Sequence, residues 1–195
     1  HFGLVTAVDF SGNPLKVTVD EKQQIVAESV IIATGASAKY LGLPGEVLYN
    51  NKGVSACAVC DGYFYRGKEV AVVGAGDSAA EESTYLSKLC TKVHLIVRRD
   101  EMRASKIMQQ RVFNTPNIEI HWDTETEEIL GDDNGVNAIR VVNNKTGKKT
   151  NIPVQGFFLA IGHKPNTDIF KGIIDMDETG YIQVLPGSTK TNIPG

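Results

Sequence analysis

The chain has 195 residues and a formal net charge of −3, with 42% hydrophobic and 22% charged residues. This composition is ordinary for a globular protein, and the length is enough to bury a core in one large domain or two smaller ones. No face-wide excess of Lys and Arg favours nucleic-acid binding, and no apolar run approaches the roughly 18 residues of a membrane span.

The cysteines indicate redox chemistry. The three cysteines of the chain are too few for a disulfide scaffold, and two of them form a C-x-x-C motif, Cys57 to Cys60. In a chain with βαβ patterning this motif predicts thiol–disulfide exchange in a reducing compartment, so we expect a cytoplasmic location. No signal-peptide pattern opens the chain. Because it starts at His1 in mid-pattern and stops at a turn signal, we expect a segment of a longer protein.

The first quarter of the chain is rich in β patterns. Alternating apolar and polar residues at 2–10 and 15–20 predict a β-hairpin around a turn at 11–14. A further β-rich run, 29–33, ends at Thr34-Gly35, and 36–44 has the composition of a connection.

The middle of the chain predicts one βαβ unit. Residues 69–73 and 93–97 are apolar runs of the kind buried in a parallel sheet, and 77–89 has helical composition.

The second half predicts another helix and more strands. Helix formers fill 103–113, and an Asn/Pro-rich stop follows. Strand-like runs lie at 118–122, 136–142 and 150–160, with an acidic stretch (123–133) and a hairpin turn (143–147) among them. The expected fold is α/β: a Rossmann-like domain whose parallel sheet carries an antiparallel β excursion.

A glycine turn follows the first strand of the βαβ unit. Gly74-x-Gly76-x-x-Ala79 matches G-x-G-x-x-G/A, in which the first glycine permits a tight bend and the second lets the backbone approach a pyrophosphate. A small third residue allows close strand–helix packing. Asp77 or Ser78 could cap the helix, with Glu81 completing a capping box. The strand-to-helix context favours a dinucleotide site, and a tight turn without ligand is the alternative.

Arginines stand where the second strand ends. NAD-binding proteins place Asp or Glu there for the ribose 2′-hydroxyl, whereas this chain has Arg98 and Arg99, with Arg103 further on. The guanidinium fork suits a phosphate dianion, so the three residues predict a 2′-phosphate clamp and NADPH rather than NADH. A solvated basic patch is the alternative. Asp100 could hold a ribose, but we expect it to be a helix N-cap.

The C-x-x-C motif can close a small ring, and a thiolate there can attack a partner disulfide. Asp61, which follows Cys60, could move the proton that the exchange requires. The alternatives are two unconnected thiols or half of a zinc site. Cys90 and the scattered histidines supply no second ligand pair, so no metal site is expected. Cys90, His94 and Trp122 are expected to be structural.

Together these residues resemble the low-molecular-weight thioredoxin reductases. The resemblance is carried by five runs: Ile31 to Gly35, Ser55 to Gly62, Gly74 to Ala79, Arg98 to Asp100 with Arg103, and Ala160 to Thr167. The cysteine run inside a nucleotide-binding domain is highly specific, and the others are supportive. The family often has His where this chain has Val97, and its first G-x-G-x-x-G and its final Gly-Asp segment are absent from this sequence.

The resemblance implies an enzyme that uses NADPH and FAD, is a homodimer at full length, and passes electrons through a Cys57–Cys60 disulfide to thioredoxin. It implies an NADPH-binding domain, 42–165, inserted into an FAD domain of which 1–41 and 166–195 are parts, with hinge connections near Ala38 and Pro165. By the same resemblance Cys60 is the cysteine nearest the flavin, Cys57 attacks thioredoxin, and Asp61 is the proton donor. The resemblance adds four cofactor-binding residues: Thr34, Gly35, Ile161 and Gly162.

Two other functions remain open. A related flavoprotein reduces a peroxiredoxin partner, but its members usually carry an acidic residue in place of Arg98 and Arg99. A non-catalytic NADP(H)-binding module would not require both cysteines.

Overall fold

The computed structural model describes residues 3–195 and divides them into two compact units. Unit 1 combines the beginning of the chain, up to Ser37, with the end from His163 onward, and unit 2 is the continuous segment Ala38–Gly162. One unit is therefore inserted into the chain of the other.

Unit 1 contains an antiparallel sheet in the order β1-β2-β3, built from Val5–Asp9, Leu15–Val19 and Gln23–Ala27. The predicted hairpin is confirmed, and a third strand extends it. Its small core joins both ends of the sequence, since Phe10 stacks on Phe170 with ring centroids 6.2 Å apart. Phe170 belongs to a short 3-10 helix, η2 (Asp168–Phe170).

The predicted strand at 29–33 is wrong. This segment has no strand assignment, and Ile31 is 93% exposed. Val30 donates one backbone hydrogen bond, to the Gly195 carbonyl at 2.8 Å, but no ladder forms on either side. The β-branched residues of this segment favour a strand only where a neighbouring strand and a half-buried surface are available. The described residues provide neither here.

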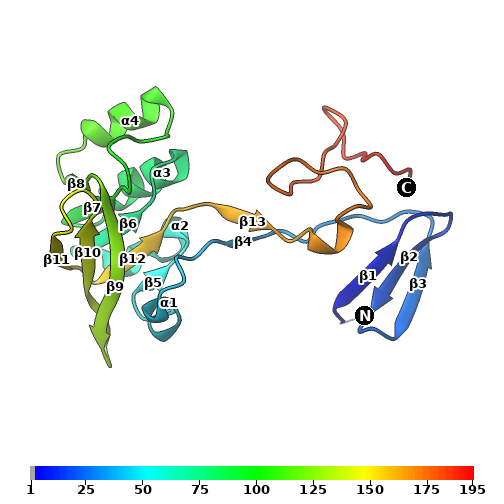
Figure 1. The fold of residues 1–195 in the computed structure, drawn as a ribbon, viewed down its shortest axis with the longest axis horizontal. Coiled ribbons are helices and arrows are strands. Elements are labelled where there is room, and N and C mark those ends of the chain that lie inside the picture. The colour runs from blue at the N-terminus through cyan, green and yellow to red at the C-terminus, as the bar shows by residue number, and fades with distance from the viewer. Residues whose placement is uncertain (1–2) are drawn as a thin grey trace. The chain divides into compact units, whose positions relative to one another are not determined.

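Unit 2 is organised around a parallel sheet in the order β5-β12-β6-β7-β8 (Figure 1). Its strands, in that order, are Val54–Ser55, Gly156–Leu159, Glu69–Val73, Lys92–Ile96 and Ile118–His121. The predicted βαβ unit is present, because β6 and β7 pair in parallel and α3 (Asp77–Leu86) connects them. Helix α4 (Lys106–Phe113) leads from β7 to β8.

The two faces of this sheet are covered differently. Alternate residues of β6 and β7, such as Val72 and Leu95, pack against α3 and α4. The others, such as Val73 and Ile96, pack against a second sheet, β11-β10-β9. That antiparallel sheet consists of Lys149–Pro153, Gly135–Asn143 and Thr124–Asp132.

The antiparallel excursion is confirmed, but two of its boundaries were predicted wrongly. The acidic stretch 123–133 is largely strand β9, whose Glu127 and Glu128 pair with Lys149 and Arg140 on the other strands. The run predicted as one strand at 150–160 is two, because β11 ends at Pro153 in the antiparallel sheet and β12 begins at Gly156 in the parallel one.

The remaining elements lie along the connections. β4 (Ala36–Ala38) pairs with β13 (His163–Pro165) as a two-stranded ribbon. Helix α1 (Pro44–Leu48) follows, and its buried Glu46 accepts hydrogen bonds from the amides of Leu41, Gly42 and Leu43. This carboxylate holds the backbone of 41–43 against α1, near the beginning of unit 2 at Ala38.

Candidate active site

The cysteine motif and the glycine turn follow the carboxyl ends of two strands of the same parallel sheet, β5 and β6, which are separated by β12. Cys57 comes shortly after β5, Ile161 shortly after β12, Gly74 directly after β6, and Arg98 shortly after β7. Because parallel strands end at the same edge of a sheet, the structure brings these segments to one edge, where open α/β sheets bind their ligands.

The two cysteines of the motif form a disulfide, Cys57–Cys60, with Cα atoms 5.3 Å apart. Cys57 is the N-cap of the short helix α2 (Ala58–Asp61), and its Sγ accepts a hydrogen bond from the Cys60 amide at 3.2 Å. Cys60 lies on the exposed side and Cys57 is half-buried. A disulfide held at the surface in this way is accessible to an attacking thiolate.

Ser55 links the disulfide to Asp61. The Ser55 hydroxyl donates to Asp61 Oδ2 at 2.6 Å and accepts from the Cys57 amide at 3.0 Å. This buried serine therefore fixes the carboxylate relative to the first cysteine. The sequence analysis did not identify Ser55, although its spacing from Cys57 and Asp61 is short enough to suggest such a link.

A second carboxyl lies next to α2. Glu82 of α3 lies beside the backbone amide of Ala58, the residue after Cys57, which acts to lower the pKa of the carboxyl. Burial, reinforced by the charge of Glu81, raises the pKa of Glu82 to about 7. Among the residues that the structure describes, the Glu82 Oε2 atom has no hydrogen-bond partner. Glu82 is therefore a group next to α2 that can exchange a proton near neutral pH.

Exposed apolar side chains lie close to the disulfide in the sequence. Val59, Tyr63 and Phe64 are 71%, 66% and 71% exposed. The last two belong to the 3-10 helix η1 (Gly62–Tyr65), which continues directly from α2. Exposed apolar residues at this density mark a surface suited to another protein.

The glycine turn has the geometry its motif predicts. Gly74 has φ +148°, and a Cβ there would lie 2.4 Å from the Ala160 carbonyl oxygen and 2.8 Å from Ala79 Cβ. Gly74 and Ala79 are thus required for close strand–helix packing. Gly76 is different, because a Cβ there would meet nothing within 4 Å. Packing within the protein does not account for Gly76, whereas the approach of a ligand to its backbone would.

The predicted helix cap is wrong. Helix α3 has Gly76 as its N-cap, and no side chain caps it. The Asp77 carboxylate accepts instead from the backbone amide and the hydroxyl of Ser105, both at 2.8 Å, and these bonds lower the pKa of Asp77. Ser78 lies exposed beside it in the first turn.

The segment after β7 folds back onto the glycine turn. The amides of Arg103 and Ala104 donate to the Ala75 carbonyl at 2.7 and 3.0 Å. All three arginine side chains of the predicted clamp are exposed, and Arg98 Nε lies 3.9 Å from Glu125 Oε1. The backbone thus brings Arg103 to the turn.

The predicted role of Asp100 as a helix N-cap is wrong, since Ser105 occupies that position of α4. Asp100 Oδ2 lies 3.3 Å from Lys145 Nζ, and this contact lowers the pKa of Asp100.

The other predicted cofactor residues lie in different units. Ile161 and Gly162 follow Ala160, the residue whose carbonyl contacts Gly74, and Gly162 has φ +96°. Thr34 and Gly35 belong to unit 1, where their carbonyls accept hydrogen bonds from Asn166.

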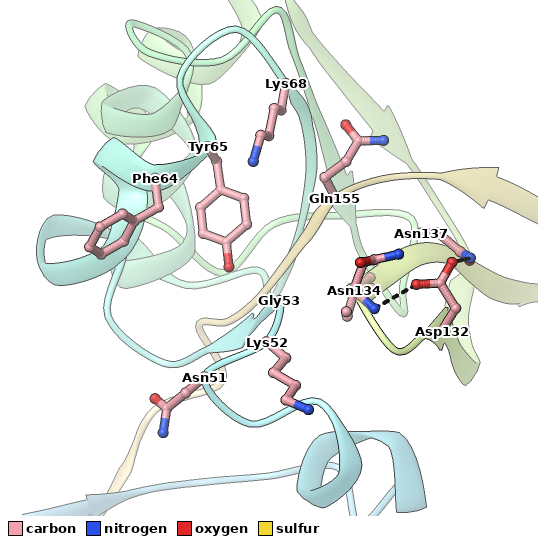
Figure 2. Close-up of a pocket in the computed structure, with 12 residues that line it drawn as sticks. Asn51, Lys52, Gly53, Phe64, Tyr65, Lys68, Asp132, Asn134, Asn137 and Gln155 are labelled. Carbon is pink, nitrogen blue, oxygen red and sulfur yellow. Dashed lines mark hydrogen bonds between the residues drawn. The ribbon is translucent and has the colours of Figure 1, made fainter.

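A pocket of about 330 Å³ in unit 2 contains none of these predicted residues (Figure 2). Lys52, Tyr65 and Lys68 contribute to its wall. The Asp132 carboxylate accepts from the Asn134 amide at 2.8 Å and so is held by its own turn. The disulfide, the glycine turn and the three arginines therefore lie outside this pocket.

The fold and the site define a class: a Rossmann-type protein that carries an exposed disulfide. Comparison with known proteins agrees. Residues 3–195 match the family model described as pyridine nucleotide-disulphide oxidoreductase, and the chain belongs to that family.

More particularly, the chain is similar to thioredoxin reductases. It is 50% identical over 195 residues to that of Dictyostelium discoideum and 46% identical over 196 residues to thioredoxin reductase 1 of Saccharomyces cerevisiae, in each case over 98% of this chain and 61% of the relative. The crystal structure from Lactococcus lactis matches with a TM-score of 0.84 and 39% identity, over 100% of this chain and 64% of that one. The structure from Giardia duodenalis gives a TM-score of 0.87 and 42% identity over the same shares. The chain thus spans about three fifths of the length of these relatives.

Proposed function

We propose that this chain is the part of a thioredoxin reductase that binds NADPH and carries the redox-active disulfide. The observation that carries the proposal is that the Cys57–Cys60 disulfide and the Gly74–Ala79 turn both follow parallel strands at the same edge of one sheet. A protein that needed only to bind a nucleotide would not require the disulfide at that edge.

On this proposal unit 2 is the NADPH-binding domain and the two segments of unit 1 belong to an FAD domain. The open space that a Cβ on Gly76 would enter is consistent with a pyrophosphate at the amino end of α3. Asp77, Ser78, Ile161 and Gly162 would contribute to the same site, and Arg98, Arg99 and Arg103 would bind the 2′-phosphate. Thr34 and Gly35 would contact FAD, which supplies the two-electron relay between nicotinamide and disulfide.

The chain's own residues perform the exchange with thioredoxin. In the reduced state the Cys57 thiolate attacks the thioredoxin disulfide, and a mixed disulfide forms as one thioredoxin sulfur leaves. Cys60 then attacks Cys57, which restores the Cys57–Cys60 bond and releases the second sulfur. Two electrons pass to thioredoxin, with two protons for its thiols, and Asp61 transfers a proton at Cys60. Exposed Val59, Tyr63 and Phe64 form the surface on which thioredoxin docks.

Two further properties are part of the proposal. The full-length protein is a homodimer, as the resemblance implies. Its location is cytoplasmic, because a C-x-x-C pair in so cysteine-poor a chain suits a reducing compartment. Some similar proteins are named as mitochondrial, including thioredoxin reductase 2 of Saccharomyces cerevisiae. Among the described residues no helix is long and apolar enough to cross a bilayer.

The nucleotide half of the proposal is tested by titrating the 195-residue chain with NADPH and NADH, following nicotinamide fluorescence. NADPH is expected to bind more tightly. Replacing Arg98, Arg99 and Arg103 by Ala should weaken NADPH binding by two or more orders of magnitude, since each charge-assisted bond contributes about 1.5–3 kcal/mol. NADH binding should change little. An equal loss for both nucleotides would contradict the phosphate clamp, and a preference for NADH would favour the peroxiredoxin-linked reductase.

The disulfide half is tested separately. A Cys60→Ser variant should trap a stable mixed disulfide between Cys57 and oxidised thioredoxin, detectable by mass spectrometry. The reciprocal Cys57→Ser variant serves as the control and should trap far less. Equal trapping by both variants, or by neither, would contradict the assigned roles.

A further inference from the structure

A histidine cluster lies on the last two strands of the parallel sheet, β7 and β8. His94 of β7 is paired in register with Ala71 of β6 and Glu119 of β8, and His121 of β8 is paired with Ile96. Neighbours Val93 and Leu95 point toward α3 and α4. Since side chains alternate along a strand, His94 points to the opposite face, with Glu119 and His121 beside it.

The ligand atoms of these three side chains converge. His94 Nδ1 lies 3.0 Å from His121 Nε2, and His121 Nε2 lies 3.7 Å from Glu119 Oε1. One ligand atom from each of His94, Glu119 and His121 falls within 4.8 Å of the others. His94 is 6% exposed at its side chain and His121 is 20% exposed, so the cluster is partly shielded from water.

Glu69 determines which nitrogen of His94 is free to act as a ligand. The Glu69 Oε2 atom lies 3.1 Å from His94 Nε2. A carboxylate only accepts hydrogen bonds, so Nε2 carries the proton and Nδ1 of the neutral ring presents its lone pair to His121. A carboxylate bound to the far nitrogen of a ring is the usual support of a metal-bound histidine.

We propose that His94 Nδ1, His121 Nε2 and Glu119 Oε1 form a binding site for a borderline transition-metal dication of the Zn²⁺ type, with Glu69 as the residue that orients His94. Two imidazole nitrogens and one carboxylate oxygen suit Zn²⁺, Co²⁺ or Cu²⁺, and not Mg²⁺ or Ca²⁺, which prefer oxygen ligands. Three protein ligands leave a fourth position for water.

The spacing of the nitrogens fits such an ion. Two nitrogens bound at 2.0–2.1 Å in a tetrahedral site lie about 3.3 Å apart, which is only slightly more than the distance between His94 and His121. When the ion binds, the single ring proton of His121 moves from Nε2, where it was shared with His94, to Nδ1, so that Nε2 presents its lone pair to the metal and no net proton is released. The ion would join β7 to β8, the edge strand of the parallel sheet.

One cation competes for the site. Lys92 Nζ forms an ion pair with Glu119 Oε2, which leaves Oε1 as the oxygen directed to His121. The lysine side chain is 39% exposed and can withdraw into solvent. Removing its charge should therefore tighten metal binding, the opposite of what loss of a ligand would do.

The test titrates the 195-residue chain with Co²⁺ and Zn²⁺ while the Cys57–Cys60 disulfide is kept oxidised. His1 is replaced by Ala in every sample, because an amino-terminal histidine can itself bind these ions. We expect one equivalent to bind, with the visible bands of four- or five-coordinate Co²⁺ and no thiolate charge-transfer band. His121→Ala should weaken binding at least tenfold, Glu69→Gln about tenfold, and Lys92→Met should strengthen it.

His163→Ala is the matched control, since His163 is exposed and lies outside the cluster. Its binding should equal that of the parent protein. Urea unfolding of each variant checks that it folds. If a histidine variant does not fold, pulsed electron paramagnetic resonance of Cu²⁺ bound to the parent protein decides the question. A spectrum that shows two coordinated imidazoles supports the site, and one that shows a single imidazole or none overturns it. The proposal is also overturned if His163→Ala weakens metal binding as much as His121→Ala does.

Discussion

Single hydrogen-bonding side chains hold the disulfide in its surroundings. Ser55 connects the Cys57 amide to the Asp61 carboxylate, and Glu82 lies beside the amide of Ala58. Neither residue type suggests redox chemistry by itself, and their importance follows only from what they contact. At this scale the sequence was sufficient to predict that Cys57 and Cys60 can form a disulfide and that the chain bends tightly at Gly74. Both features depend on residues that are close together in the sequence.

Replacing Ser55 by Ala should slow thiol–disulfide exchange and lower stability. The change leaves the Cys57 amide and the Asp61 carboxylate without their shared partner, which should cost about 1–3 kcal/mol of unfolding free energy. Urea unfolding and the rate of reduction of oxidised thioredoxin by the pre-reduced chain would measure both effects. Ser37→Ala, which removes an exposed hydroxyl bonded to Asn166, is the control and should change neither quantity appreciably. A variant that exchanges at the parent rate would contradict the positioning role of Ser55.

Because of Glu82, the protein should become less stable as the pH rises toward neutrality. Its pKa of about 7 in the folded state lies above the value of about 4.3 expected in an unfolded chain. Between these values the folded state binds more protons, so stability decreases as the pH rises from about 4.3 to about 7.

A Glu82→Gln variant should remove that dependence. Unfolding in urea at pH 5 and pH 8 should show a smaller decrease for the variant, by about 1 kcal/mol once partial solvent exposure is allowed for. Glu101→Gln, at an exposed position, is the control and should keep the parent profile. An unchanged difference between the two pH values in Glu82→Gln would rule out this carboxyl as the source.

Among the elements, strands with local support were easier to predict than strands made by distant partners. β6 and β7 were predicted correctly, because each is a continuous apolar run and such runs are typical of strands that are buried on both faces. β9 was missed because a segment rich in glutamate has the composition of a loop. The ion pairs that its glutamates form with Arg140 and Lys149 become evident only in the folded structure. The histidine cluster was missed for the same reason, since its ligands are far apart in sequence and meet only through strand register.

The two glycines of the turn should respond differently to substitution. Gly74→Ala places a Cβ 2.4 Å from the Ala160 carbonyl at φ +148°, and should destabilise the chain by at least about 1–3 kcal/mol. Gly76→Ala, whose Cβ meets nothing, should change stability by less than about 1 kcal/mol. The same Gly76 variant should nevertheless weaken NADPH binding at least tenfold, because the methyl group would occupy the approach to the backbone. Urea unfolding with NADPH titration would measure both, and unimpaired binding by Gly76→Ala would contradict a pyrophosphate at this turn.

At the scale of the molecule, unit 2 has a core of its own on both faces of its parallel sheet. The resemblance in sequence suggested an inserted domain. The first and last residues of the compact unit, however, depend on tertiary contacts that cannot be inferred from the sequence. Glu46 binds the backbone of 41–43, and the Lys39 amide donates to the Gly162 carbonyl at 3.0 Å. These contacts extend the unit to Ala38 at one end and end it at Gly162 at the other.

Residues 38–162 should therefore fold without the rest of the chain. We expect the isolated segment to unfold cooperatively in urea, and to bind NADPH as the 195-residue chain does, since the glycine turn and the arginines lie inside it. Circular dichroism with nicotinamide fluorescence would measure this. A segment limited to 42–162 is the comparison and should be less stable, because it lacks Lys39 and one of the amides that Glu46 binds. Loss of cooperative unfolding in 38–162 would show that unit 2 depends on unit 1.

The backbone hydrogen bond between Lys39 and Gly162 has a consequence for how such a protein can change in evolution. A segment whose entry and exit lie one hydrogen bond apart can be added to a host chain, removed from it or exchanged for another without stretching the host backbone. The host loses only a short loop at the point of insertion. Unit 2 can therefore be exchanged as a whole, and under the proposed function a change of electron donor or of disulfide partner would leave the flanking segments as they are.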